Sequence, residues 1–230
     1  MPNRPYHSTH AIVPLNIPEM SKLRLSKVLS KEERARLTLL MLDHVLATLR
    51  RARTISSVTV VSADRKISER LRKSGVRFLW EGRKRGLNSA ITFAQRKIML
   101  EDNSSVLIIH ADLPILDPKD VNNFVRISGR YEVGICPSND GRGTNALFLK
   151  TPNLIPPAFG RESFRKHLSL IHEKSLRHKI LRLRGIGFDL DNMKDLEKLI
   201  QTSAGNDVSR YLRKKMDQKR QPHASTLRRA

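Results

Sequence analysis

The sequence predicts an α/β protein built as a three-layer sandwich, in which helices cover both faces of a mainly parallel mixed sheet. Short apolar and β-branched segments alternate along the chain with longer amphipathic segments, which is the pattern of successive β-α-β units. The chain of 230 residues, 39% of them hydrophobic, is long enough to bury a sizeable core between such layers. Such sheets bind ligands beyond the carboxyl ends of their strands, so residues that follow strands are the candidates for chemistry.

The first strand and the first helix follow from the amino-terminal part of the chain. Residues 11–15 form a short apolar run that suits a buried strand, and the loop after it, residues 16–28, is rich in Lys and Arg. Ser30 and Glu33 have the spacing of a capping box, which predicts a long helix after Ser30. The apolar positions of this helix recur every three or four residues: Ala35, Leu39, Leu42, Leu46 and Leu49.

The rest of the chain continues the alternation. Apolar or β-branched segments bounded by polar residues predict strands at residues 58–62, 76–80, 105–110, 133–136, 145–149 and 179–183. Amphipathic segments predict helices at residues 64–74, 87–101, 163–174 and 193–200. A further helix is predicted to begin at Asp117, because Asp is a common N-cap and Pro118 follows where a missing N–H costs nothing.

The charge of the chain is strongly positive. A formal net charge of +22 and a pI near 10.9 predict attraction to polyanions such as nucleic acids, anionic membranes or phosphorylated metabolites. Residues 205–230 hold eight basic and two acidic residues and few large apolar side chains. We expect one folded domain over residues 1–204 and a basic, flexible, solvated tail with at most a helical stub at residues 208–216. Such a tail could contact nucleic acid nonspecifically without a functional role.

Cysteine usage and hydropathy indicate a cytoplasmic protein. Cys136 is the one cysteine, which excludes an intramolecular disulfide and any multi-cysteine metal site, and fits a reducing interior. No apolar run approaches the roughly 18 residues of a membrane-spanning helix, so no membrane association is expected. The first six residues also lack the apolar core of a secretory signal.

Two basic residues and three acidic residues carry the candidate chemistry. Lys22 and Arg24 follow the first strand and could hold phosphates, although the segment has no Walker motif and could be a solvated loop. Asp112 directly follows an apolar strand and could hold Mg²⁺, or could satisfy loop amides instead. Asp189 and Asp191 could join Asp112 around the metal, with helix capping as the competing role. The neighbouring His110 is interpreted as scaffold.

Glycine and hydroxyl-bearing residues gather in three other segments, residues 86–90, 137–146 and 159–167. Glycine allows backbone amides to approach an anion, and Thr144 and Ser163 could donate to a phosphate or carboxylate, Ser163 from the start of a helix. Each segment by itself is also compatible with an ordinary turn.

Taken together and in order, these motifs resemble the 2-phospho-L-lactate guanylyltransferase family, called CofC in archaea and FbiD in actinobacteria. The matching strings lie at residues 13–25, 86–90, 112–114, 137–147, 159–167 and 189–196, within a similarity that runs from about residue 11 to 200. The resemblance implies a nucleotidyltransferase fold of the nucleotide-diphospho-sugar transferase type. It also implies transfer of GMP from GTP to 2-phospho-L-lactate, phosphoenolpyruvate or 3-phosphoglycerate, with release of pyrophosphate, in coenzyme F-420 biosynthesis, and a homodimer.

The resemblance also implies roles for individual residues. Mg²⁺ is expected on Asp112, Asp189 and Asp191. The three-carbon phosphoacid is expected at Thr144, Gly160 and Ser163. The nucleotide is expected at Pro14, Lys22, Arg24 and Asn88, with Lys22, Arg24 and Asp112 as the catalytic set. The sequence departs from the family pattern at Asn16, where Lys is usual, and at Arg142, which interrupts a common Gly-Gly-Thr.

Two other functions remain open at this stage. A different nucleotide-sugar-type nucleotidyltransferase or a glycosyltransferase would also combine an α/β sheet with acidic metal ligands, and the acceptor would distinguish it. A non-enzymatic nucleic-acid-binding protein is suggested by the net charge, but the sequence has no recognised helix-turn-helix, zinc or aromatic RNA-binding signature.

Overall fold

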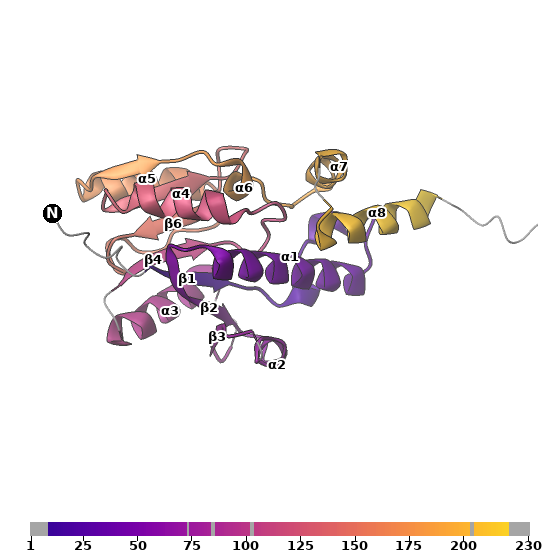
Figure 1. Ribbon diagram of the computed structural model, residues 1–230, viewed down its shortest axis with the longest axis horizontal. Coiled ribbons are helices and arrows are strands. Elements are labelled where there is room, and N and C mark those ends of the chain that lie inside the picture. The colour runs from indigo at the N-terminus through magenta and orange to yellow at the C-terminus, as the bar shows by residue number, and fades with distance from the viewer. Residues whose placement is uncertain (1–8, 73, 84–85, 102–103, 203–204, 221–230) are drawn as a thin grey trace, which may run out of the picture.

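The computed structural model describes residues 9–72, 74–83, 86–101, 104–202 and 205–220, and these residues form a seven-stranded sheet covered by helices (Figure 1). The strand order is β3-β2-β1-β4-β6-β5-β7. The strands are β1 (Thr9–Pro14), β2 (Ile55–Ser62), β3 (Arg77–Trp80), β4 (Ser105–Ile109), β5 (Val133–Pro137), β6 (Thr144–Leu149) and β7 (His178–Ile180). Each strand expected from the sequence is present, with shifts of a few residues at the ends.

One strand, β6, makes the sheet mixed. β1 pairs in parallel with β2 and β4, β2 pairs in parallel with β3, and β5 with β7, whereas β6 is antiparallel to both β4 and β5. The prediction of a mainly parallel mixed sheet is therefore confirmed. Because β6 runs in the opposite direction, its first residues lie beside the carboxyl end of β4. Ile109 pairs with Ala146, and the His110 N–H donates to the Asn145 carbonyl at 3.1 Å.

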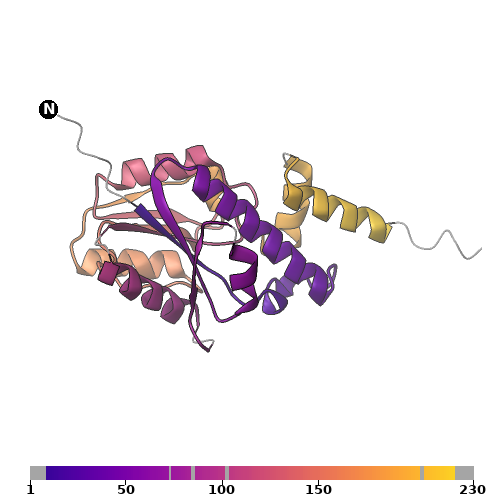
Figure 2. The same cartoon turned by 60° about the horizontal axis from the view of Figure 1, so that its bottom comes forward.

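Helices pack on both faces of the sheet, which confirms the three-layer sandwich (Figures 1 and 2). Alternate residues of a strand point to opposite faces. Ala11 and Val13 accordingly pack in one apolar cluster with α1, α2 and α4, whereas Ile12 packs in another with α3 and α5. These helices are α1 (Lys31–Arg51), α2 (Lys66–Leu71), α3 (Leu87–Glu101), α4 (Pro118–Ser128) and α5 (Ser163–Glu173).

Local sequence signals begin α1 and α4 as expected. Ser30 and Glu33 form the complete capping box of α1, and the Asp117 side chain accepts from the Lys119 N–H at 2.7 Å at the start of α4. The helix expected over residues 64–74 is shorter, since α2 covers six residues; Gly75 adopts φ +67° beyond it. Among the helices of the described ranges, none combines the length and apolarity needed to cross a lipid bilayer.

The carboxyl-terminal helix α8 (Asp207–Arg220) differs from the solvated tail expected after residue 204. It lies with α7 (Met193–Thr202) at the end of the molecule beyond the sheet, next to α1 (Figures 1 and 2). Val208 and Leu212 are fully buried there. These two positions are four apart and so lie on the same face of a helix that is otherwise highly charged. The composition of this segment does not mark that face as buried; the packing of α8 against α1 and α7 does. Residues 221–230 lie outside the described residues.

The buried residues beneath α8 form what we call the outer cluster. It joins the loop before α1, two buried residues of α1, the segment before α7, and α7 and α8 themselves. Its members are Leu25, Leu29, Leu37, Met41, Phe188, Leu190, Leu196, Leu199, Val208 and Leu212. The carboxyl-terminal helices are therefore part of the packed body rather than an appendage.

Truncation of a buried α8 side chain should destabilise the protein. Leu212→Ala is expected to lower the free energy of unfolding by about 3 kcal/mol, because it removes buried apolar surface and leaves a cavity in the outer cluster. Urea unfolding followed by circular dichroism measures this loss. Lys214→Ala, at an exposed position of the same helix, is the matched control. Equal stabilities of the two variants would contradict the packing of α8.

Candidate active site

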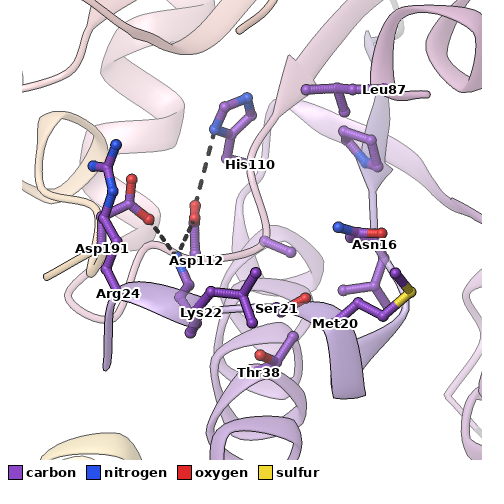
Figure 3. Close-up of a pocket in the computed structure, with 14 residues that line it drawn as sticks. Asn16, Met20, Ser21, Lys22, Arg24, Thr38, Leu87, His110, Asp112 and Asp191 are labelled. Atoms are coloured by element: carbon purple, nitrogen blue, oxygen red, sulfur yellow. Dashed lines mark hydrogen bonds and ion pairs between the residues drawn. The ribbon is translucent and has the colours of Figure 1, made fainter. Parts of the chain in front are cut away.

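A cavity of about 400 Å³ lies where the strands β1 and β4 end (Figure 3). Five of the ten residues singled out in the sequence line it: Pro14, Lys22, Arg24, Asp112 and Asp191. The first three follow or end β1, Asp112 follows β4, and Asp191 precedes α7. Segments that are far apart in the chain therefore place two cationic and two anionic side chains around one opening, as the position of the strand ends predicts.

Lys22 lies between two of the aspartates (Figure 3). Its Nζ donates to Asp112 Oδ2 at 2.6 Å and to Asp191 Oδ1 at 2.7 Å. Lys22 itself adopts a left-handed backbone conformation, with φ +54°, between the short 3-10 helices η1 (Pro18–Met20) and η2 (Leu23–Leu25). A non-glycine residue in this region carries a modest strain and is maintained by surrounding contacts. The backbone conformation of this loop therefore directs the Lys22 ammonium group toward Asp112 and Asp191.

Two kinds of contact hold the segments that carry the charges. Leu25 from the loop and Leu190, which separates Asp189 from Asp191, are both buried in the outer cluster. The Leu190 N–H donates to the Asp112 carbonyl at 3.2 Å, which ties the two acidic segments together directly. Arg34 from α1 donates from its Nη1 to the Leu29 carbonyl at 2.9 Å. The position of the charges therefore depends on helices outside the sheet.

The ion pairs shift the ionisation of their members. Burial by itself disfavours the charged form of Lys22, but Asp112 and Asp191 outweigh it and raise the pKa of the ammonium well above its ordinary value. Burial likewise opposes ionisation of Asp112, yet Lys22 and His110 hold the pKa of its carboxyl below its ordinary value. Lys22 and Asp112 are therefore both charged at neutral pH.

Asp189 stands beside this pair in a less favourable environment. Burial, followed by the neighbouring charges of Asp112 and Asp191, raises the pKa of Asp189 to about 6. Asn145 Nδ2 donates to Asp189 Oδ1 at 3.3 Å and to the carbonyls of Ile186 and Gly187 at 3.0 and 3.1 Å. Asn145 thus holds the acidic segment against the start of β6.

The acidic residues suit a hard divalent cation in their chemistry, but the structure does not arrange them as a finished metal site. Asp112 Oδ1 is buried and accepts no hydrogen bond from the described residues, and carboxylate oxygens are the donors that Mg²⁺ prefers. Within the same residues, however, no three Asp, Glu, His or Cys side chains are placed together for a metal ion. The Lys22 ammonium stands between two of the three expected ligands. Mg²⁺ commonly uses one or two carboxylates and completes its shell with water and substrate phosphates, so the residues present fit such a cation.

A second polar cluster contains two of the residues expected at the acceptor site. Ser163 Oγ accepts from the Thr144 N–H at 2.9 Å, and Thr144 Oγ1 lies 3.0 Å from His167 Nδ1. His167 Nε2 accepts from the Ala158 N–H at 3.0 Å, so Nδ1 carries the proton and donates to Thr144. Phe159 packs against the rings of both His167 and His110, with centroid distances of 4.8 and 5.4 Å. The cluster is therefore next to the main cavity, on the far side of Phe159.

Two expected residues lie elsewhere. Asn88 does not line the main cavity, because its amide oxygen accepts from the Phe159 N–H at 2.8 Å and its amide nitrogen donates to the Phe159 carbonyl at 3.1 Å. This side chain holds the segment before α5 and is a positioning group in the structure. Gly160 is exposed and has φ +112°, a conformation that permits the turn into α5.

Sequence reasoning missed several residues of the site. His110 lines the cavity, with its Nδ1 3.9 Å from Asp112 Oδ1, although the sequence favoured a scaffold role. Asn145 and His167 lie within the motifs at residues 137–147 and 159–167, but the sequence alone assigned neither of them a role. No periodicity or spacing marks these residues, because their contacts join β6 to segments 20 to 45 residues away; only the antiparallel placement of β6 brings them to the site.

The sequence of the whole described body matches a known family. Residues 9–230 match the family model described as guanylyl transferase CofC like. The chain belongs to this family. The resemblance inferred from the motifs is confirmed, as is the nucleotidyltransferase class, and the match includes α8. Two CofC-like relatives are the phosphoenolpyruvate guanylyltransferase of Sphaerobacter thermophilus, 33% identical over 84% of this chain and 92% of the relative, and the 2-phospho-L-lactate guanylyltransferase of Methanocaldococcus vulcanius, 33% identical over 88% and 89%.

Solved structures support the fold of this CofC-like protein. A candidate nucleotide-diphospho-sugar transferase from Desulfovibrio desulfuricans superposes with a TM-score of 0.75 at 17% identity, over 92% of this chain and 96% of that chain. A 4-diphosphocytidyl-2C-methyl-D-erythritol synthase superposes with a TM-score of 0.59 at 14% identity, over 84% and 97%. The expected nucleotide-diphospho-sugar transferase-like fold is therefore confirmed.

The buried His167 should make the protein sensitive to acid. Burial, together with the nearby His110, lowers the pKa of His167 to about 4 from an ordinary value of 6.5. The unfolded chain therefore gains a proton on this imidazole as the pH falls below 6.5, whereas the folded protein gains it only near pH 4. The stability that depends on the neutral ring is complete above pH 6.5 and is lost progressively down to pH 4, by about 3 kcal/mol.

Urea unfolding at pH 7.0 and 4.5 tests this effect. His167→Gln removes the titration, so its stability should fall less than that of the wild type between the two pH values, by about 2 kcal/mol. His172→Gln, at an exposed position of α5, should fall as much as the wild type. The same pH dependence in all three proteins would sink the prediction.

Proposed function

We propose that this protein transfers GMP from GTP to the phosphate of a three-carbon phosphoacid and releases pyrophosphate, as an early step of coenzyme F-420 biosynthesis. The acceptor candidates are 2-phospho-L-lactate, phosphoenolpyruvate and 3-phosphoglycerate; relatives of this protein are named as guanylyltransferases of the first two. The single observation that carries the proposal is the cavity in which Lys22, Arg24, Asp112 and Asp191 meet at the carboxyl ends of the strands. Such a cavity has the cations for a triphosphate and the carboxylates for a phosphate-bound metal.

The chemistry requires little from the protein beyond position and charge. An oxygen of the acceptor phosphate attacks the α-phosphorus of GTP, a new P–O bond forms, and the bond to the β-phosphate oxygen breaks as pyrophosphate leaves. The acceptor phosphate is already ionised at neutral pH, so no strong general base is needed. Lys22 and Arg24 lower the repulsion between the two anions and hold the triphosphate in line.

A divalent cation completes this proposal. Asp112, with Asp191 or Asp189, would hold Mg²⁺ together with phosphate oxygens of GTP. When bound, Mg²⁺ supplies neutralising charge at the phosphates and stabilises the leaving pyrophosphate. Asp112 has a buried oxygen without a hydrogen bond from the described residues, which supports its choice as the principal ligand.

The acceptor is proposed to bind at the Thr144 and Ser163 cluster. Ser163 is the first residue of α5, and the positive end of the dipole of this 11-residue helix favours a carboxylate or phosphate nearby. Gly160 allows the chain to turn closely around such an anion. The neighbouring Phe159 packs against His167 of this cluster and against His110 of the main cavity, so the acceptor would bind next to the nucleotide.

The direct test is guanylyl transfer with purified protein. Incubation with Mg²⁺, GTP and each of the three phosphoacids should release pyrophosphate with at least one of them and yield a guanosine diphospho-acid detectable by mass spectrometry. Sugar 1-phosphates serve as the alternative acceptors. Product with sugar phosphates alone would replace the proposal by a nucleotide-sugar transferase, and release of no pyrophosphate with any acceptor would end it.

Loss of the Asp112 charge should abolish most of the activity. Asp112→Asn is expected to lower kcat at least about 100-fold, because it removes a charged oxygen from the site where phosphate charge must be balanced. Its circular dichroism spectrum should match that of the wild type. Asp217→Asn, at an exposed position of α8, should retain full activity. Near-normal transfer by Asp112→Asn would remove this residue from the proposed mechanism.

Lys22 should compete with a divalent cation for the carboxylates. Lys22→Met removes the ammonium from between Asp112 and Asp191, so the nucleotide-free variant should bind Mn²⁺ about tenfold more tightly than the wild type. The electron paramagnetic resonance signal of free Mn²⁺ measures this affinity without any turnover. Lys27→Met, exposed in the same loop, should leave the affinity unchanged. An unaltered Mn²⁺ affinity in Lys22→Met would contradict shared use of the carboxylates.

A further inference from the structure

A second cavity, which we call the basic cavity, lies where the turn between α1 and β2 meets α4. It has a volume of about 660 Å³ and is lined by Arg53, Thr54, Lys119, Asp120, Asn122, Asn123 and Arg126. These seven residues are different from those that line the main cavity. Thr54 directly precedes β2, so the basic cavity lies toward the amino end of this strand. The main cavity, in contrast, lies where the parallel strands end.

Two elements form the walls of the basic cavity and are joined to each other. Four of the lining residues are spaced three or four apart and so share one face of α4: Lys119, Asn122, Asn123 and Arg126. The facing wall is the turn that follows α1. Asn122 Oδ1 accepts from both the N–H and the Oγ1 of Thr54, each at 3.0 Å. These bonds fix the α4 face against the turn, so the cavity is a built feature of the fold.

The two amide side chains present donors to the basic cavity. The bonds from Thr54 use the oxygen of Asn122, and Asn123 Oδ1 accepts from Arg126 Nη2 at 3.2 Å. A backbone N–H and a guanidinium can only donate, which fixes the orientation of both amides. The Nδ2 groups of Asn122 and Asn123 therefore remain to donate to a ligand.

The charge of the basic cavity favours an anion. Arg53, Lys119 and Arg126 are exposed, and the ion pairs among the described residues include none of the three. Asp120 is the one carboxylate among the described residues of the lining, and its Oδ2 accepts from the Gly185 N–H at 2.8 Å. Three cations thus surround one cavity with a single, partly engaged carboxylate, so an anionic ligand would restore the balance of charge.

We propose that the basic cavity binds a small phosphorylated metabolite at a site separate from the active site. Two guanidinium groups offer paired N–H donors that match phosphate oxygens, and Lys119 adds a compact charge. The cavity volume is in the range of sites that hold ligands of nucleotide size. The cations surround one cavity, whereas a nucleic-acid strand is typically bound along a groove that follows its backbone. The inference does not depend on the proposed function.

Protection of individual arginines from chemical modification tests the site. Phenylglyoxal modifies exposed guanidinium groups, and mass spectrometry of peptides follows each arginine separately. Tripolyphosphate, added without divalent cations, should slow the modification of Arg53 and Arg126 by about tenfold at ten times its half-protecting concentration. Arg72, exposed after α2, is the internal reference and should react at an unchanged rate. Equal protection of all three arginines, or protection of none, would overturn the inference.

Removal of one cation should weaken this protection. Lys119→Gln should raise the half-protecting concentration of tripolyphosphate about tenfold, because it removes a charge-assisted hydrogen bond to the phosphate. Lys66→Gln, at an exposed position of α2, removes the same charge elsewhere and should leave that concentration unchanged. An equal effect of the two variants would mean a general attraction to a basic protein and would contradict a defined site.

Other phosphate compounds identify the source of the ligand. ATP carries the same chain of three phosphates and adds a nucleoside. Half-protection by ATP at a lower concentration than by tripolyphosphate would support a nucleotide, and protection at an equal or higher concentration would support recognition of the phosphate chain alone. Protection of Arg53 and Arg126 by an eight-residue single-stranded RNA but not by tripolyphosphate would replace the small ligand by nucleic acid and overturn the proposal.

Discussion

The site is organised around one buried cation. Lys22 Nζ contacts Asp112 and Asp191, which lie 90 and 169 positions further along the chain, so a single ammonium joins three separate segments. Carboxylates withdrawn from water need compensation, and an unpaired buried charge is costly. Beside this pair, burial and the charges of Asp112 and Asp191 raise the pKa of Asp189 to about 6.

The packing behind the charges is as important as the charges themselves. The outer cluster holds Leu25 of the Lys22 loop and Leu190 between the two aspartates, and it is closed from outside by Val208 and Leu212 of α8. The carboxyl-terminal helix therefore supports the cavity from a distance, through apolar contacts and not through its many basic residues. Its inclusion in the family match agrees with this structural role.

A single reversed strand unites the two halves of the site. β6 is antiparallel to β4, and its first residues, Thr144 and Asn145, consequently lie at the edge where the parallel strands end. Thr144 forms hydrogen bonds with His167 and Ser163, while Asn145 donates a hydrogen bond to Asp189. The strand thus connects the cavity that contains Lys22 and Arg24 with the amino end of α5, the two places proposed for the two anionic substrates.

The sequence by itself determined the class of fold, the strands and most helices, because these follow from local periodicity and caps such as Ser30 and Asp117. It also singled out the charged residues around the cavity, because they follow strand ends within recognisable motifs. Only the tertiary structure decided that Asn88 positions Phe159, that His110, Asn145 and His167 surround the site, and that α8 is packed. The reason is physical: those facts depend on strand direction and on which apolar faces meet, and neither is encoded within a short stretch of chain.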